Sequence, residues 1–250
     1  MSLTWILGHF LAVISGLSLG LLGGGGSLLM VPILLYVFDL PHRSAIALSL
    51  ALVGVMSIPA VLTYWKRNQI HGKALLLFSP FAMIGTYLGA KLTTFLNLSR
   101  SFQLNLFCIF VAIAAWYMIR PSPNKSQVKP HPPRALLLAG VGFMVGILSG
   151  IVGMGGGFAI VPALVLLAGI PMTFAVGTSL TVICLKSGAG FMGYIQDLVI
   201  PWKLAGSLSL TAMLGIFMGT ALARKIPAHK LKRAFGVFLL LVGSFIFIKG

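Results

Sequence analysis

Two glycine-rich tracts hold the groups in this sequence that are best suited to binding a ligand. One reads GLLGGGGSLLMVP and begins at Gly20, and the other reads GIVGMGGGFAIVP and begins at Gly150. Glycine loses the most conformational entropy in a helix and accepts positive φ, so such a tract interrupts a helix. The N–H groups that open the next helix then lack an acceptor within it, and their partial positive charge favours an anion. The tracts predict an anion site that includes Gly25, Gly26, Ser27, Gly155, Gly156 and Gly157.

A proline follows each tract and adds backbone acceptors to the same region. Pro32 and Pro162 have no N–H, so each leaves the carbonyl four residues earlier without its helical donor. We include both prolines in the predicted site. The alternative is that the glycines serve only to let helices pack closely, as small residues do in membranes.

Several side chains could contact the same anion. Lys186 stands inside the apolar stretch TVICLKSGAGF, where an uncompensated cation costs about 2.5–3.5 kcal/mol in a bilayer. It therefore either faces the substrate, or snorkels or pairs with Asp197. Arg43 follows Pro41 at the start of a predicted helix and is either a second anion contact or a loop charge. Hydroxyl donors inside the spans are Ser49, Thr178 and Ser179, unless they bond only to their own helix carbonyls.

Other chemistry lacks the residues it would need. The chain has only two acidic residues, Asp39 and Asp197, and its five histidines are scattered. We expect no metal site, no cofactor and no carboxylate pair for acid–base catalysis. The tract at Gly20 resembles a phosphate-binding loop, but Gly26 occupies the position of the essential lysine. A membrane-embedded enzyme is thus a weaker alternative to a transporter, and an anion channel is a closer one.

The composition is that of a membrane protein. Hydrophobic residues make up 58% of the 250 residues and charged residues only 8%, against about 25% charged in soluble domains. Apolar runs long enough to cross a bilayer recur along the chain. The net charge of +16 comes mostly from loops between these runs, which is typical of topology signals rather than nucleic-acid binding. We predict an all-α, multi-pass protein of the cell (inner) membrane whose partners are lipid and a small anion; a homodimer remains open.

The two tracts belong to an internal repeat. A shift of 130 residues aligns the halves without gaps and pairs Pro41 with Pro171, Ser49 with Ser179, and Tyr64 with Tyr194. The predicted organisation is a first repeat over 1–120, a basic, proline-rich linker over 121–134 and a second repeat over 135–250. Each repeat has four long apolar segments and one short, broken or re-entrant one. The long ones are Leu3–Leu22, Ser44–Tyr64, Lys73–Leu96, Ser101–Ile119, Ala135–Val152, Phe174–Ile195, Lys203–Ala223 and Leu231–Ile248, and the short ones are Ser27–Phe38 and Phe158–Ala168.

The charge distribution predicts that the two repeats are inverted in the membrane. If each short segment crosses, twelve of the Lys and Arg residues lie on one side and five on the other. If it dips and returns to the same side, the two sides carry nearly equal numbers. Only the first arrangement gives the cytoplasmic excess expected of membrane proteins, with the linker in the cytoplasm and both termini outside. Inverted repeats with glycine- and proline-interrupted segments at matching positions are typical of secondary transporters.

The paired tracts, together with GTYLGAKL at Gly85 and GIFMGTAL at Gly215, resemble the sulfite exporter TauE/SafE family of membrane transporters. The resemblance extends over essentially the whole chain. It implies export or uptake of a small sulfur-containing anion such as sulfite, thiosulfate, sulfoacetate or a similar organosulfonate, and of the two directions we expect export.

Overall fold

The computed structural model describes residues 3–96, 99–119, 135–152, 157–194 and 201–249. Over these residues the chain is helical and contains no strand. The first half of the chain contains α1 (Leu3–Leu22), α2 (Gly25–Pro32), the π-helix η1 (Ile33–Val37), α3 (His42–Lys66), α4 (Gly72–Phe95) and α5 (Arg100–Ile119). The second contains α6 (Ala135–Val152), α7 (Gly157–Pro162), the π-helix η2 (Ala163–Leu167), α8 (Met172–Tyr194), α9 (Trp202–Ala223) and α10 (Ala228–Lys249).

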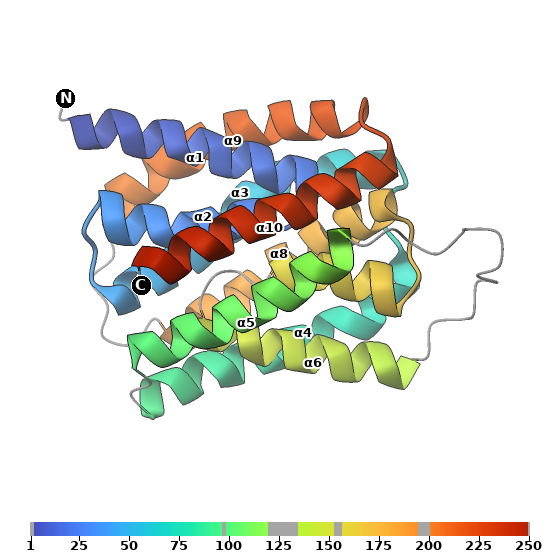
Figure 1. The fold of residues 1–250 in the computed structure, drawn as a ribbon, viewed down its shortest axis with the longest axis horizontal. Coiled ribbons are helices and arrows are strands. Elements are labelled where there is room, and N and C mark those ends of the chain that lie inside the picture. The colour runs from blue at the N-terminus through green and yellow to red at the C-terminus, as the bar shows by residue number, and fades with distance from the viewer. Residues whose placement is uncertain (1–2, 97–98, 120–134, 153–156, 195–200, 250) are drawn as a thin grey trace.

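Six of these helices are long and apolar enough to cross a membrane: α1, α3, α4, α6, α8 and α9. Most helices run along the long axis of the molecule in Figure 1. The beginning of α1 and the end of α10 lie at the left of that view, whereas the end of α5 and the beginning of α6 lie at the right. The two ends of the described chain are therefore together, on the side opposite the α5–α6 connection.

The helices of the two halves pack against one another in matching pairs. α1 packs on α9 and α4 packs on α6, and the 130-residue shift exchanges these two contacts. α3 packs on α8 and α5 on α10, so these helices meet their own equivalents. Two tyrosines repeat the pattern in detail: Tyr64 Oη donates to the Gly20 carbonyl at 3.3 Å, and Tyr194 Oη donates to the Gly150 carbonyl at 2.6 Å. The repeat seen in the sequence is thus present in the packing as an approximate two-fold relation.

The α1–α9 and α4–α6 pairs have their backbones in contact. A Cβ on Gly215 would lie 2.0 Å from the Val13 carbonyl oxygen, and one on Gly85 would lie 2.4 Å from that of Phe143. Small residues four apart let membrane helices approach this closely, where dispersion and weak hydrogen bonds stabilise the pair. The two G-x-x-x-G motifs therefore have a packing role.

The short segment after each glycine tract lies close to where the sequence predicts it. Helix begins at Gly25 and at Gly157, and it continues through Val37 and Leu167. Only Gly23 and Gly24 of the first tract lie outside a helix, so Gly25 and Gly26 are helical rather than unwound. The segment runs back beside α1: a Cβ on Gly8 would lie 2.3 Å from the Phe38 ring, and the Trp5 and Phe38 rings are in edge contact. α1 and α2–η1 thus form a hairpin whose two ends lie at the same end of the molecule.

A π-helix follows each proline directly. Because Pro32 and Pro162 cannot donate, the ladder after them widens, with Phe38 N bonded to Ile33 O and Ala168 N to Ala163 O, both at 3.3 Å. The prolines therefore disturb the hydrogen bonding of their helices, as the sequence predicts. The disturbance takes the form of a π-helical turn, which the sequence does not indicate.

Candidate functional site

The break between α1 and α2 is held by a residue from the other half of the chain. Gly23 has φ of +75°, a conformation that side chains oppose, and Gly24 completes the turn. The Ser179 hydroxyl of α8 donates to the Gly23 carbonyl at 2.7 Å. A Cβ on Gly23 would lie 2.7 Å from that same hydroxyl oxygen, so the contact requires glycine. Ser179, which the sequence offered as a hydroxyl contact for the anion, thus lies beside the first glycine tract.

The helices that follow the two breaks begin next to each other. A Cβ on Gly24 would lie 2.3 Å from the Gly157 carbonyl oxygen, and one on Gly157 would lie 2.8 Å from the Gly24 Cα. The Ser27 hydroxyl donates to the Gly24 carbonyl at 2.8 Å and lies beside Gly157. Two helix N-termini, each with a partial positive charge, are thus brought together in the interior. Like-signed helix ends repel, and an anion between them would remove that repulsion.

Glycine has two different roles within the first tract. A Cβ on Gly26 would lie 2.0 Å from the Ser15 carbonyl oxygen, and the Ser15 hydroxyl donates to the Gly26 carbonyl at 2.7 Å. Close packing therefore accounts for Gly26. A Cβ on Gly25 would instead meet the edge of the Phe238 ring at 3.0 Å, a contact with the end of a side chain that can move.

One face of α8 runs along both breaks. Val176 and Ser179 contact Gly23, and the side chain of Ile183 contacts Gly157. Lys186 comes one turn further along the same face, about 10 Å from Ser179 by helix rise. Figure 1 shows α8 passing through the middle of the bundle.

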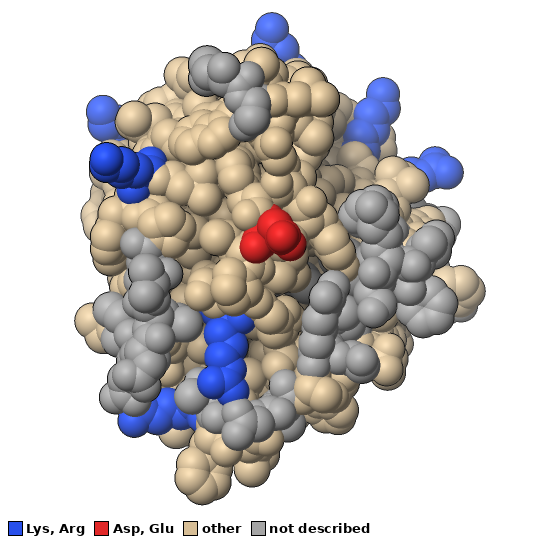
Figure 2. All heavy atoms as spheres, turned by 90° about the vertical axis from the view of Figure 1, so that its left-hand side faces the viewer, with Lys and Arg blue, Asp and Glu red and all other residues tan. Residues whose placement is uncertain are grey.

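Lys186 is fully buried, and its Nζ donates to the Ser149 hydroxyl of α6. The predicted pairing with Asp197 falls outside the described residues. Asp39, the only acidic residue among the described ones, is exposed in the loop before α3. Figure 2 shows it as an isolated acidic patch on the surface, whereas Lys186 is fully buried, so it is not a counter-ion for this lysine.

Other predicted site residues lie away from the breaks. The Thr178 hydroxyl accepts the His71 N–H at 2.9 Å and so holds the α3–α4 loop. Arg43 is exposed near the start of α3, about 9 Å along that helix from Ser49. Ser49 is buried and donates to the Ile46 carbonyl at 2.8 Å. Pro32 and Pro162 are buried at the far ends of α2 and α7. Gly155 and Gly156 lie outside the described residues.

Ser149 is a polar residue of this region that the sequence analysis missed. The signal was available, because the 130-residue shift places Ser149 opposite Leu19, a serine opposite a leucine just before the glycine tract. Among the described residues, no three His, Cys, Asp or Glu side chains are placed to hold a metal ion.

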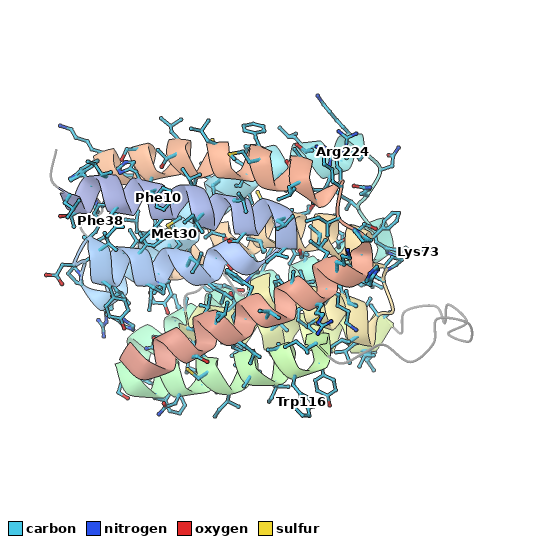
Figure 3. The ribbon with its side chains drawn as sticks, turned by 45° about the horizontal axis from the view of Figure 1, so that its top comes forward. Phe10, Met30, Phe38, Lys73, Trp116 and Arg224 are labelled. Atoms are coloured by element: carbon cyan, nitrogen blue, oxygen red, sulfur yellow. The ribbon has the colours of Figure 1, made fainter. Side chains whose placement is uncertain are left out.

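The basic side chains are unevenly placed between the two ends. Figure 3 shows Lys73 and Arg224 together at one end of the molecule and Phe38 at the other. The Arg67 guanidinium bonds to the Thr220 carbonyl, which places the α3–α4 loop beside the last turn of α9. Lys66, Lys73, Arg224 and Lys225 thus belong to one end of the molecule.

Comparison with known proteins agrees with this architecture. The family model described as sulfite exporter TauE/SafE matches residues 9–246. A probable membrane transporter protein of Xylella fastidiosa (strain Temecula1) is 29% identical over 238 residues, covering 92% of this chain and 90% of its own. The probable membrane transporter protein YunE of Bacillus subtilis (strain 168) is 27% identical, covering 96% of both chains. One from Methanocaldococcus jannaschii is 31% identical and covers 74% of this chain and 72% of its own.

No solved structure matches this chain. The match of the family model covers nearly the whole sequence, and the relatives are similar along most of their own length. The chain therefore belongs to the sulfite exporter TauE/SafE family, a family of membrane transporters.

Proposed function

We propose that this protein is a secondary transporter of a small sulfur-containing anion, such as sulfite, thiosulfate, sulfoacetate or a similar organosulfonate. The observation that carries the proposal is the meeting of two helix N-termini at Gly24 and Gly157, one turn of α8 from the buried Lys186. Positive helix ends, and a lysine that has no carboxylate partner among the described residues, favour an anion in preference to a cation or a neutral molecule.

The proposed substrate contacts fall into two groups. Backbone N–H groups come from the beginnings of the short helices, and hydroxyl or ammonium groups come from the helices around them. The backbone N–H groups are those of Gly25, Gly26, Ser27, Gly155, Gly156 and Gly157. The side-chain groups are those of Ser49, Ser179 and Lys186. Pro32 and Pro162 act indirectly by ending regular α-helix beyond the site, and Thr178 positions the α3–α4 loop. Arg43 is a second anion contact at the outer end of the path.

We propose that the two halves, residues 1–120 and 135–250, are inverted repeats joined by a cytoplasmic linker over 121–134. The exchange of the α1–α9 and α4–α6 contacts under the 130-residue shift supports this. So does the return of α2–η1 to the level of Trp5, because it places Phe38 on the same side as the start of α1. An approximate two-fold axis in the membrane plane then passes near the Gly24–Gly157 contact.

Export across the cell (inner) membrane is the proposed direction. An anion that leaves a cell with a negative interior gains about 2.3 kcal/mol per charge per 100 mV. The basic end of the molecule, with Lys73 and Arg224, would face the cytoplasm and raise the local concentration of the anion there. A homodimer is compatible with the exposed apolar faces of the outer helices, and it is not needed for the site.

A thermal-shift screen of the purified protein tests the proposed function. Sulfite, thiosulfate, sulfate, sulfoacetate and taurine are compared with chloride at matched ionic strength. A ligand at 100 times its Kd stabilises the folded state by about 2.7 kcal/mol, so at least one sulfur anion should raise Tm.

Two variants sharpen this screen. Lys186→Gln should lose the ligand-dependent rise in Tm. Lys91→Gln is the matched control, because Lys91 is an exposed lysine that lies over the Tyr87 ring. Equal shifts in chloride and in every sulfur anion would contradict the proposal.

A further inference from the structure

The polar pair Lys186–Ser149 has no counterpart in the other half of the chain. The 130-residue shift places Met56 at the position of Lys186 and Leu19 at that of Ser149. All four residues are buried, with exposed fractions of 1% or less. The first half thus fills the equivalent space with two apolar side chains, so the fold does not require an amine there. Replacing buried charged groups with apolar ones of similar size is often neutral or stabilising, which makes the lysine costly for stability alone.

A second polar group beside Lys186 is unused. The Ser187 side chain is fully buried, and its hydroxyl oxygen has no hydrogen-bond partner among the described residues. Its repeat equivalent, Ser57, donates to the Gly54 carbonyl at 2.8 Å. A buried hydroxyl without a partner costs free energy, and a polar ligand that reached this part of α8 would supply the missing hydrogen bond.

The groups around Lys186 offer it no negative charge. Among the described residues, the hydrogen bond to Ser149 is the only polar contact of its Nζ. α6, α7 and η2 carry no titratable side chain. On α3, α4, α1 and α10, the other helices that pack against α8, the charged or titratable residues lie mostly toward the helix ends. They are His9, His42, Arg43, Tyr64, Lys66, Lys73, Tyr87, Lys91, His229, Lys230, Lys232, Arg233 and Lys249, and α8 itself adds Cys184 and Tyr194.

From these observations we infer that Lys186 carries a proton together with the anion, so that each transported anion is accompanied by one proton. In the empty site the lysine is an uncharged amine that shares a hydrogen bond with Ser149, whose hydroxyl can either donate or accept. When an anion enters, the amine takes one proton from water on the side of entry. The ammonium and the anion then form a pair, and both the proton and the anion leave to the other side.

This inference rests on the proposed function and changes its energetics. A divalent anion such as thiosulfate that moves with one proton exports one net negative charge instead of two. A negative interior still favours export, and a more alkaline cytoplasm opposes it. The membrane-spanning helices that the structure describes contain no carboxylate, the usual proton carrier of transporters, and Lys186 provides a proton-carrying group in its place.

Calorimetric titration of thiosulfate into the purified protein tests the inference without requiring transport. Thiosulfate is used because it stays fully ionised near neutral pH and brings no proton of its own. Titrations in two buffers with different ionisation enthalpies give the number of protons taken up on binding. We expect about one proton to be taken up per thiosulfate bound. In the pH range where the free amine is uncharged, the affinity should fall by up to about tenfold for each unit that the pH rises. Binding without proton uptake would overturn the inference and leave the proposed function standing, whereas no binding of any sulfur anion would remove the proposed function itself.

Variants at the lysine identify the group that takes the proton. Lys186→Arg keeps a permanent positive charge, so it should bind thiosulfate with no proton uptake. Lys186→Met copies the equivalent Met56, so it should keep the wild-type Tm and lose at least tenfold in affinity. Lys91→Arg is the control and should retain both affinity and proton uptake. Wild-type proton uptake in the arginine variant, or wild-type affinity in the methionine variant, would overturn the assignment to Lys186.

Discussion

Two adjacent glycines, Gly25 and Gly26, show how closely neighbouring residues of one motif can differ in role. Both are helical and both are buried at the start of α2. Gly26 touches the backbone of α1 at Ser15, which cannot move without displacing the helix. Gly25 faces only the ends of two side chains, the Phe238 ring and a Leu22 methyl group, which can move. The sequence gives no reason to distinguish the two glycines, and only their packing neighbours show that their roles differ.

Alanine substitution should distinguish the two glycines. Gly26→Ala brings a Cβ to 2.0 Å from the Ser15 carbonyl oxygen, so we expect a large loss of folded, monodisperse protein. Gly25→Ala requires only a small shift of Phe238 and should preserve the folded yield. Gly206→Ala, where the added Cβ meets nothing within 4 Å, is the neutral control. Size-exclusion chromatography in detergent measures the outcome, and equal yields of the Gly25 and Gly26 variants would contradict this account.

At the scale of elements, the break between α1 and α2 depends on α8. The Ser179 hydroxyl reaches across from the second half of the chain to the Gly23 carbonyl, a buried acceptor at the end of α1. The hydroxyl also bonds to the Val176 carbonyl of its own helix at 2.9 Å. It therefore serves both as a local helix contact and as the link that fixes the hairpin against the rest of the bundle.

Removal of this hydroxyl should loosen the hairpin. Ser179→Ala leaves the Gly23 carbonyl without its donor and should lower the free energy of unfolding by about 1–3 kcal/mol. Ser207→Ala removes a hydroxyl that bonds only to the Leu204 carbonyl of its own helix, and it should cost much less. Hydrogen exchange of the α2 amides measures the local effect. If exchange is the same in both variants, Ser179 does not hold the break.

The sequence predicted the elements better than their contacts. Glycine and proline mark the two short helices to within two residues, because each acts on its own backbone. The π-helices after Pro32 and Pro162 could not be predicted, since a missing N–H can be met by a kink, by water or by a wider turn. The Lys186–Ser149 bond joins residues 37 positions apart, and only the three-dimensional packing of α6 on the bundle brings them together. Arg43 and Thr178 met the same polar criteria but lie elsewhere, because their faces of the helices are turned toward the surface and the α3–α4 loop.

At the scale of the whole molecule, the proposed topology places the end with Phe38 and the end with Lys73 and Arg224 on opposite sides of the membrane (Figure 3). In a variant lacking Cys108 and Cys184, Asp39→Cys and Lys73→Cys each provide one target for a membrane-impermeant maleimide. We expect the reagent to reach position 39 from outside intact cells and position 73 only after the cells are opened. Arg224→Cys, at the same end as Lys73, should behave as position 73 does. Labelling of positions 39 and 73 from one side would contradict the inverted arrangement.

The central claim is that this chain carries a sulfur-containing anion through a site at the two broken helices. The most direct test is the movement of radiolabelled thiosulfate into proteoliposomes under an imposed potassium-diffusion potential. The account predicts saturable uptake that rises when the interior is positive, is inhibited by excess sulfite, and is lost in Lys186→Gln but kept in Lys91→Gln. Uptake no faster than in protein-free liposomes for every sulfur anion offered, or flux that rises linearly with concentration without saturation, would contradict it.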